Sequence, residues 1–232
     1  AIPTGVKIFN WIGTMWGGRI RFDTPMLFAL GFITMFMIGG FTGIMHSSVP
    51  IDAQHQDTYF VVAHFHYVLI GGALFGLFSG FYFWLPKITG RMMSEKLGKF
   101  VFTLMFLGFN LTFFPMHYLG MIGQPRRTHS YNEGHGFEAW NQIATVGSFI
   151  LGVGVFIGVV QFIHSFYSKR LKPAGKNPWD ARSLEWTLSS PVKDYNFART
   201  PIIKARDQAW ENNHGTKENQ SEKEPLDDHG VH

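Results

Sequence analysis

No cysteine occurs among the 232 residues, and this absence excludes disulfide-linked scaffolds, thiolate zinc sites and iron–sulfur clusters. The phosphate-cradling loop G-x-x-x-x-G-K-[ST] is also missing, which argues against a nucleotide-driven motor. The net charge is only +4, and the basic residues fall in short clusters between apolar runs. We therefore expect no nucleic-acid partner.

Charged residues are scarce through most of the chain: residues 1–168 carry 15 of them, whereas residues 169–232 carry 21. Phe (24 residues) and Gly (26 residues) are abundant. This distribution predicts a transmembrane helical body over 1–168, a cytoplasmic extension over 169–210 and a disordered acidic tail over 211–232. The first residue is Ala rather than Met, so we interpret the chain as a piece of a longer protein.

Four apolar segments without Lys, Arg, Asp or Glu are long enough to cross a bilayer: Pro25–Met45, Thr58–Pro86, Phe100–Gly123 and Ala139–Tyr167. Residues 1–16 are apolar except for Lys7 but too short to span, so we interpret them as the second half of a truncated helix. The predicted fold is an all-α membrane protein in a lipid bilayer, with four complete transmembrane helices plus the second half of one more.

Loop charges predict which side of the membrane each loop faces. Lys and Arg collect after residue 16, after residue 86 and after residue 167, which places these loops and the C-terminus in the cytoplasm. Arg126 and Arg127 then lie on the outer side, against this rule. Adjacent guanidinium groups there suit anionic head groups or cofactor carboxylates. Asp52 and Asp57 lie in the facing outer loop, where Asp57 with its neighbours suits a hard cation.

Two histidines, His64 and His66, lie inside the second predicted span, where polar groups without partners are costly. Positions i and i+2 lie about 200° apart around a helix, so a single metal ion cannot readily take both. Two large planar cofactors flanking the helix can each receive one imidazole, as haem iron does. The competing interpretation is that both are core histidines bonded to neighbouring helices; for the pair, we favour the cofactors.

Lys7 is the one formal charge inside a predicted span, and Thr4 shares its helix face. Burial makes the neutral form of a lysine accessible, so this pair suits proton relay. The alternative is a lysine that snorkels to the membrane interface. The spacing by itself does not separate the two.

Several motifs together resemble subunit I of the haem–copper terminal oxidases, specifically the bacterial aa3-type cytochrome c oxidases. They are Ile2-Pro-Thr-Gly-Val-Lys7, Asp57-Thr-Tyr-Phe-Val-Val-Ala-His-Phe-His-Tyr67, Asn110-Leu-Thr-Phe-Phe-Pro115, Pro125-Arg-Arg127, Trp140-Asn141 and Asn177-Pro-Trp-Asp-Ala-Arg-Ser-Leu-Glu-Trp186. The resemblance runs from Ala1 to about Ala198. It implies that the chain is the C-terminal half of this subunit, which carries the axial histidines of two haems.

The resemblance also implies a role for each candidate residue. His64 would be the axial ligand of the high-spin haem a3, where oxygen binds, and His66 that of the low-spin haem a. Five further residues would serve the haem propionates (Asp52, Arg126 and Arg127) or the proton pathway (Lys7 and Thr4). The implied activity is that of a proton-pumping oxidase that reduces oxygen to water with electrons from cytochrome c.

The same resemblance implies where the chain works and with what. Its partners would be the N-terminal half of subunit I, oxidase subunits II and III, and cytochrome c. Its location would be the bacterial plasma membrane, as a multi-pass protein with a cytoplasmic C-terminus.

Two departures from the family pattern matter. The copper ligands of the family lie upstream of Ala1, so copper would be held outside this chain, and the chain alone would be inactive. The family usually has His directly before the Asp of Asp57-Thr-Tyr, where it helps to bind Mg. Gln56 stands at that position here, with His55 one place earlier, which speaks against a Mg site at Asp57.

Three alternatives compete with the cytochrome c oxidase interpretation. They are a quinol-oxidising member of the same superfamily, a membrane di-haem electron carrier without oxygen chemistry, and a proton-relaying transporter without haem. Lys7 favours the enzyme over the electron carrier, because a carrier needs no buried lysine. Asp57-Thr-Tyr and the proline before Arg126 resemble the cytochrome c-oxidising members more than the quinol-oxidising ones.

Overall fold

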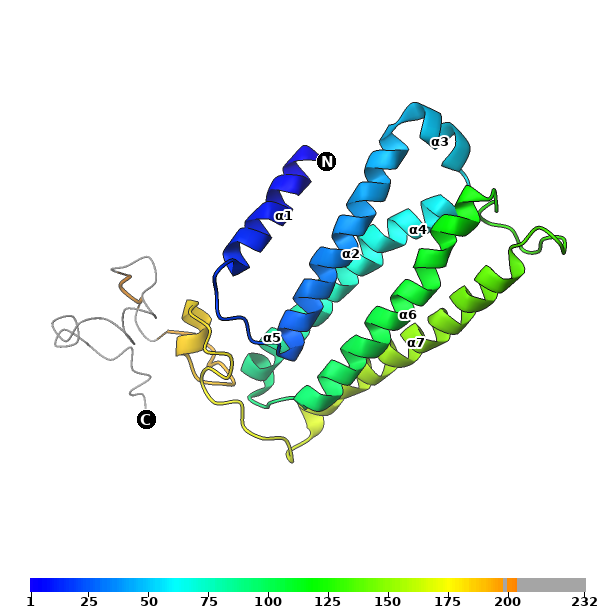
Figure 1. Ribbon diagram of the computed structural model, residues 1–232. Helices are drawn as coiled ribbons and strands as arrows, with labels where there is room; N and C mark the ends of the chain where they lie inside the picture. The colour runs from blue at the N-terminus through cyan, green and yellow to red at the C-terminus, as the bar shows by residue number, and fades with distance from the viewer. Residues whose placement is uncertain (198–199, 204–232) are drawn as a thin grey trace. The chain divides into compact units, whose positions relative to one another are not determined.

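The computed structural model describes residues 1–197 and 200–203, and this part of the chain is helical (Figure 1). Its elements are α1 (Ile2–Met15), α2 (Thr24–Ser47), α3 (Val49–His55), α4 (Tyr59–Val68), the π-helix η1 (Leu69–Leu74), α5 (Phe75–Thr89), α6 (Glu95–Met121), α7 (Glu138–Tyr167) and the 3₁₀ turn η2 (Leu184–Thr187). The predicted acidic tail, 211–232, lies outside the described residues.

Among the described residues, four helical segments are long and apolar enough to cross a membrane: Thr24–Ser47, Tyr59–Thr89, Glu95–Met121 and Glu138–Tyr167. They coincide with the four predicted spans, so the prediction of an all-α, multi-pass membrane protein is confirmed. The second segment joins α4, η1 and α5 end to end. The short N-terminal stretch forms α1, in which no residue is buried.

The chain divides into two compact units. The first contains Ala1–Tyr82 and Ser94–Gln161, and the second contains Phe83–Met93 and the chain from Phe162 onward. The candidate residues from Thr4 to Arg127 all belong to the first unit. Each unit has its own interior, and the two are described separately below.

Aromatic side chains fill the interior of the first unit. Phe28 of α2 is fully buried, and its ring contacts four others at centroid separations of 5.2–5.6 Å: Phe75, Phe78, Tyr82 and Phe102. Polar bonds fix the helix ends around this core. The Glu95 carboxylate on the first turn of α6 accepts hydrogen bonds from the backbone N–H and the hydroxyl of Thr24, at 2.9 and 2.8 Å. It thereby satisfies a free donor at the start of α2.

The second unit is organised around a buried ammonium group. Lys87 is only 3% exposed, and its Nζ donates to the carbonyl oxygens of Lys176 and Leu188, both at 2.8 Å. The same Nζ lies 5.0 Å from the centre of the Trp186 ring, within the range of a cation–π interaction. A buried charge with these partners holds the segment after α7 in one conformation.

Replacing Lys87 by Met should loosen residues 176–189. A hydrogen bond to a charged group contributes about 1.5–3 kcal/mol, and the carbonyls of Lys176 and Leu188 would lose their donor. We expect amide hydrogen exchange in this segment of the assembled membrane protein to accelerate by at least about tenfold. Lys176→Met removes an exposed charge but keeps its carbonyl, so it should leave exchange unchanged. Equal exchange in Lys87→Met and the unsubstituted protein would contradict the role of the ammonium group.

Candidate functional site

Helix α4 carries both candidate histidines and begins at a defined residue. Thr58 caps it, with its hydroxyl oxygen accepting a hydrogen bond from the backbone N–H of Phe60 at 3.2 Å. His64 and His66 follow in the second turn, and both side chains are half-buried. Because they are separated by two positions, their imidazoles leave the helix on opposite sides.

The imidazole of His64 is held from α2. Its Nδ1 lies 3.0 Å from the carbonyl oxygen of Gly39 and 3.0 Å from the hydroxyl oxygen of Thr42. The Thr42 hydroxyl itself donates to the Gly39 carbonyl oxygen, at 3.0 Å. A carbonyl oxygen only accepts, so Nδ1 must carry the hydrogen and donate it. The neutral ring then keeps an unshared electron pair on Nε2, the form in which histidine ligates a metal.

Two glycines of α2 make room for this arrangement. A Cβ atom on Gly39 would lie 2.9 Å from a methyl carbon of Val68 and 3.0 Å from its backbone nitrogen. A Cβ atom on Gly43 would lie 2.9 Å from Cε1 of the His64 ring. The intervening Gly40 faces open space, with nothing within 4 Å of its Cβ position. The small residues at 39 and 43 therefore let α2 approach α4 closely enough to bond His64.

His66 is held by its own helix and by α6. Its Nδ1 lies 2.8 Å from the carbonyl oxygen of Val62, one turn earlier, so this nitrogen also carries the hydrogen and leaves Nε2 free. The Phe113 ring of α6 is stacked on the imidazole, with centroids 4.2 Å apart and planes inclined by 14°. Phe65 also contacts it, at 4.3 Å and 32°.

The two imidazoles fit axial donors for two separate haems. Both present Nε2 with its electron pair, both have Nδ1–H bound to a carbonyl, and they leave the helix on opposite sides. Within residues 1–197 and 200–203, no three His, Asp or Glu side chains are grouped so that they could hold a metal ion. Each imidazole offers one nitrogen ligand to a metal ion, as the axial histidine of a haem does.

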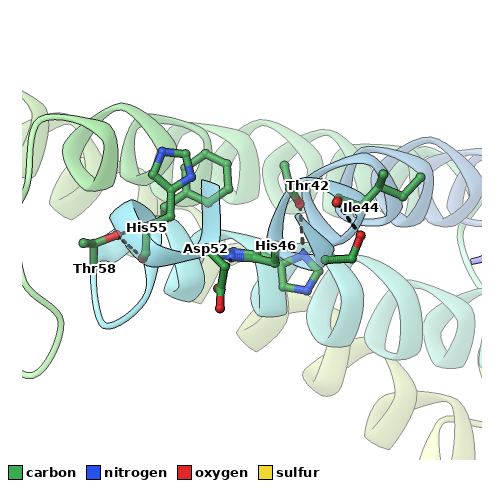
Figure 2. A network of polar contacts seen from close by, with 9 residues as sticks. Thr42, Ile44, His46, Asp52, His55 and Thr58 are labelled. Atoms are coloured by element: carbon green, nitrogen blue, oxygen red, sulfur yellow. Dashed lines mark hydrogen bonds and ion pairs between the residues drawn. The ribbon is translucent and has the colours of Figure 1, made fainter. Parts of the chain in front are cut away.

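A polar cluster at the end of α2 includes the predicted residue Asp52 (Figure 2). Its carboxylate accepts from Nδ1 of His46 at 3.4 Å. The His46 ring in turn lies 5.1 Å from that of His64, and its Nε2 is buried without a partner in the structure. Burial lowers the pKa of His55, the neighbouring His46 lowers it further, and Asp52 opposes both effects. His55 is therefore neutral at pH 7.

The two outer arginines differ in their contacts. Arg126 donates from Nε to a carboxylate oxygen of Asp57 at 2.7 Å and forms an ion pair with the same oxygen. Arg127 is exposed and takes part in none of the hydrogen bonds or ion pairs found in the described part of the chain. The predicted cation ligand Asp57 is thus already paired with Arg126, while its neighbour Gln56 is exposed.

Lys7 and Thr4 lie on α1, where the structure leaves Lys7 exposed and Thr4 half-buried. Their shared face follows from the three-residue spacing. The side chain of Lys7 takes part in none of the hydrogen bonds or ion pairs found among the described residues. Helix α1 is fastened to α2 through Trp11, whose ring lies 4.9 Å from that of Phe32 in an edge-to-face arrangement.

The supporting residues of the two histidines were missed by sequence reasoning. Thr42, Val62 and Phe113 carry no signal of their own, and Val62 and Gly39 act through backbone carbonyls. The Gly39-x-x-x-Gly43 spacing is typical of close contact between membrane helices, but nothing in it indicates that the contact serves His64. Phe113 lies within the motif Asn110–Pro115 that carried the family resemblance, but nothing in that motif indicates a ring stacked on His66.

Comparisons with known proteins agree with the motifs. The family model described as cytochrome C and quinol oxidase polypeptide I matches residues 1–150. Cytochrome c oxidase subunit 1 of Alkalihalophilus pseudofirmus is 49% identical over 208 residues, which cover 89% of this chain and 33% of that protein. The same subunit of Bacillus subtilis is 45% identical over 229 residues, covering 98% of this chain and 36% of that protein.

A quinol oxidase subunit 1 from Bacillus spizizenii is similar to the same extent, at 47% identity over 208 residues, covering 89% of this chain and 32% of that protein. The solved structure of a heme-copper terminal oxidase dimer shares the fold, with a TM-score of 0.58 and 22% identity over 65% of this chain and 28% of that one. The chain thus spans about a third of the length of these relatives. It belongs to the family of subunit I of the cytochrome c and quinol oxidases, as its motifs predicted.

Proposed function

We propose that the chain is part of the catalytic subunit of a proton-pumping terminal oxidase that reduces oxygen to water with electrons from cytochrome c. Its own contribution is to hold one axial position of each of two haems, haem a3 at His64 and haem a at His66. The observation that carries this proposal is the pair of imidazoles on α4, each with Nδ1–H bound to a carbonyl and Nε2 free.

The bonds to Nδ1 do more than orient the rings. A hydrogen bond from Nδ1–H to a carbonyl makes Nε2 a better donor and fixes the tautomer that ligates metal. When bound, the two haems supply electron transfer and oxygen binding. His64 and His66 would hold the two haems on opposite sides of a single turn of α4, and α2 and α6 keep each ring in place.

On the outer side, we assign haem carboxylates to Arg126, Arg127 and Asp52. The guanidinium of Arg127 is exposed and available for a bidentate bond to a carboxylate. Arg126 uses part of its donor set on Asp57 and retains other N–H groups. Asp52 would act together with His46, which holds it by a hydrogen bond. A Mg ion at Asp57 would need further ligands from other chains, since Gln56 replaces the expected histidine.

We assign Lys7 and Thr4 to a proton pathway. Lys7 emerges from α1 onto a surface that no described residue covers. In the complete subunit this face would meet the rest of subunit I, which would also supply the copper ligands. There the lysine would be desolvated and could exchange a proton with the Thr4 hydroxyl or with water.

We propose that the assembly also includes oxidase subunits II and III and sits in the bacterial plasma membrane, with the C-terminus in the cytoplasm. The charge asymmetry of the loops supports this orientation. The competing di-haem electron carrier has no use for Lys7. The competing transporter has no use for histidines whose Nε2 atoms have no hydrogen-bond partner among residues 1–197 and 200–203.

The first test is an optical difference spectrum, reduced minus oxidised, of the membrane complex that contains the complete subunit. His66→Ala should remove the low-spin haem signal, and His64→Ala should remove the signal that responds to carbon monoxide, because each iron loses an axial ligand. If both variants keep both signals, the histidines are packing residues and the proposal fails.

A second prediction concerns the space around His64. Gly43→Ala should weaken or abolish the carbon monoxide-responsive signal, because the new Cβ would lie 2.9 Å from the His64 ring and push it away from its bonds. Gly40→Ala is the matched control on the same helix, with nothing within 4 Å of its new methyl group. Identical spectra for the two variants would show that the glycine does not position the ligand.

The electron donor needs its own measurement, because relatives of both kinds match at similar identity. We expect the purified complex, at saturating donor, to oxidise reduced cytochrome c at least tenfold faster than a reduced quinol. A tenfold ratio of rates corresponds to a difference of about 1.4 kcal/mol in activation free energy. The basis is the pattern Asp57-Thr-Tyr with a proline before Arg126. The reverse preference would place the chain in a quinol oxidase and leave the two-haem assignment intact.

A further inference from the structure

His66 has weaker hydrogen-bond support than His64. The Nδ1 of His64 has two oxygen atoms at 3.0 Å, from Gly39 and Thr42 on another helix. The Nδ1 of His66 has a single oxygen atom, that of Val62 on its own helix, at 2.8 Å. The plane of the ring is set by rotation about its Cβ–Cγ bond, and for His66 one acceptor on its own helix is the only polar group in the described residues that restrains this rotation. A packed neighbour can restrain it further.

Phe113 is placed to do this. Its ring lies nearly parallel to the imidazole, inclined by 14°, with centroids only 4.2 Å apart. Rotation of the imidazole about its Cβ–Cγ bond would drive its edge toward the phenyl ring. Phe113 is itself held in the interior, because its side chain is only 8% exposed.

We propose that Phe113 is a positioning residue for His66: it sets the plane of the axial imidazole and, through it, the reduction potential of the low-spin haem. This inference rests on the proposed function of His66. The stacked ring keeps the Nδ1–H directed at the Val62 carbonyl, and this bond makes Nε2 a stronger donor to iron. A stronger donor stabilises oxidised iron and lowers the potential.

Phe109 is a control residue that distinguishes a role in positioning His66 from a general role in core packing. It lies one turn away on α6, is fully buried, and contacts Tyr67, Phe75 and Phe113. It is not among the rings that contact His66 in the described residues, which are those of Phe65 and Phe113. Phe109→Leu therefore disturbs packing in the same region without removing the stacked ring.

The experiment uses the complete membrane complex with Phe113→Leu, Phe113→Tyr, Phe109→Leu and His66→Ala. Three quantities are measured for each: haem content, the electron paramagnetic resonance spectrum of the oxidised low-spin haem, and its reduction potential in a redox titration. In Phe113→Leu we expect a broadened, shifted low-spin resonance and a more positive potential. Phe113→Tyr keeps a ring to stack and should restore both values, and Phe109→Leu should match the unsubstituted complex.

The other outcomes are also decisive. An unchanged resonance and potential in Phe113→Leu would overturn the inference, as would an equal shift in Phe109→Leu. Loss of the low-spin haem in Phe113→Leu but not in Phe113→Tyr would support it, whereas loss in both would overturn it. If His66→Ala retains the low-spin signal, the haem assignment itself fails, which distinguishes that failure from a failure of the role of Phe113.

Discussion

The hydrogen bond from His64 to the Gly39 carbonyl determines how closely α2 and α4 must approach. A backbone carbonyl oxygen lies close to the axis of its helix. The imidazole of His64 can therefore donate to it only where the two helices pack at short distance. Gly39 permits that contact against Val68, and Gly43 leaves space for the ring itself. Thr42, between them, adds a second oxygen atom. One helical turn of α2 therefore supplies the space, the acceptor and the additional hydroxyl.

The two histidines share a helix but not a means of support. His64 is oriented by polar groups of α2, and His66 by a carbonyl of α4 together with an aromatic ring of α6. The difference follows from their positions two residues apart, which point the rings at different neighbours. Each imidazole is therefore held by residues that do not support the other, although one rigid helix fixes the separation of both.

The spans were predictable because apolar length and the absence of charge are properties of continuous segments. Thr24–Ser47, for instance, extends the predicted Pro25–Met45 by only a few residues. The two histidines could be singled out as candidates because polar side chains inside an apolar helix are costly unless they are bonded or liganded. The acceptors for the two Nδ1 atoms could not be predicted from the sequence, because Gly39 and Val62 act through backbone carbonyls that every residue possesses. The Asp57–Arg126 ion pair could not be predicted either. It joins residues 69 positions apart, and their contact depends on how α4 and α6 pack.

That pairing explains how two arginines come to lie beside the start of the ligand helix. The backbone N–H of Arg126 donates to the Asp57 carbonyl at 2.9 Å, and that of Tyr59 donates to the Gln124 carbonyl at 3.0 Å. The segment after α6 is thus fastened by backbone bonds to the residues that begin α4, and the ion pair adds to them. Because α4 is a rigid helix, this attachment fixes the backbone of the two arginines relative to His64 and His66. Under the proposed function, the residues that would bind the edge of a cofactor and those that would bind its centre need such a fixed separation, and these backbone bonds would provide it.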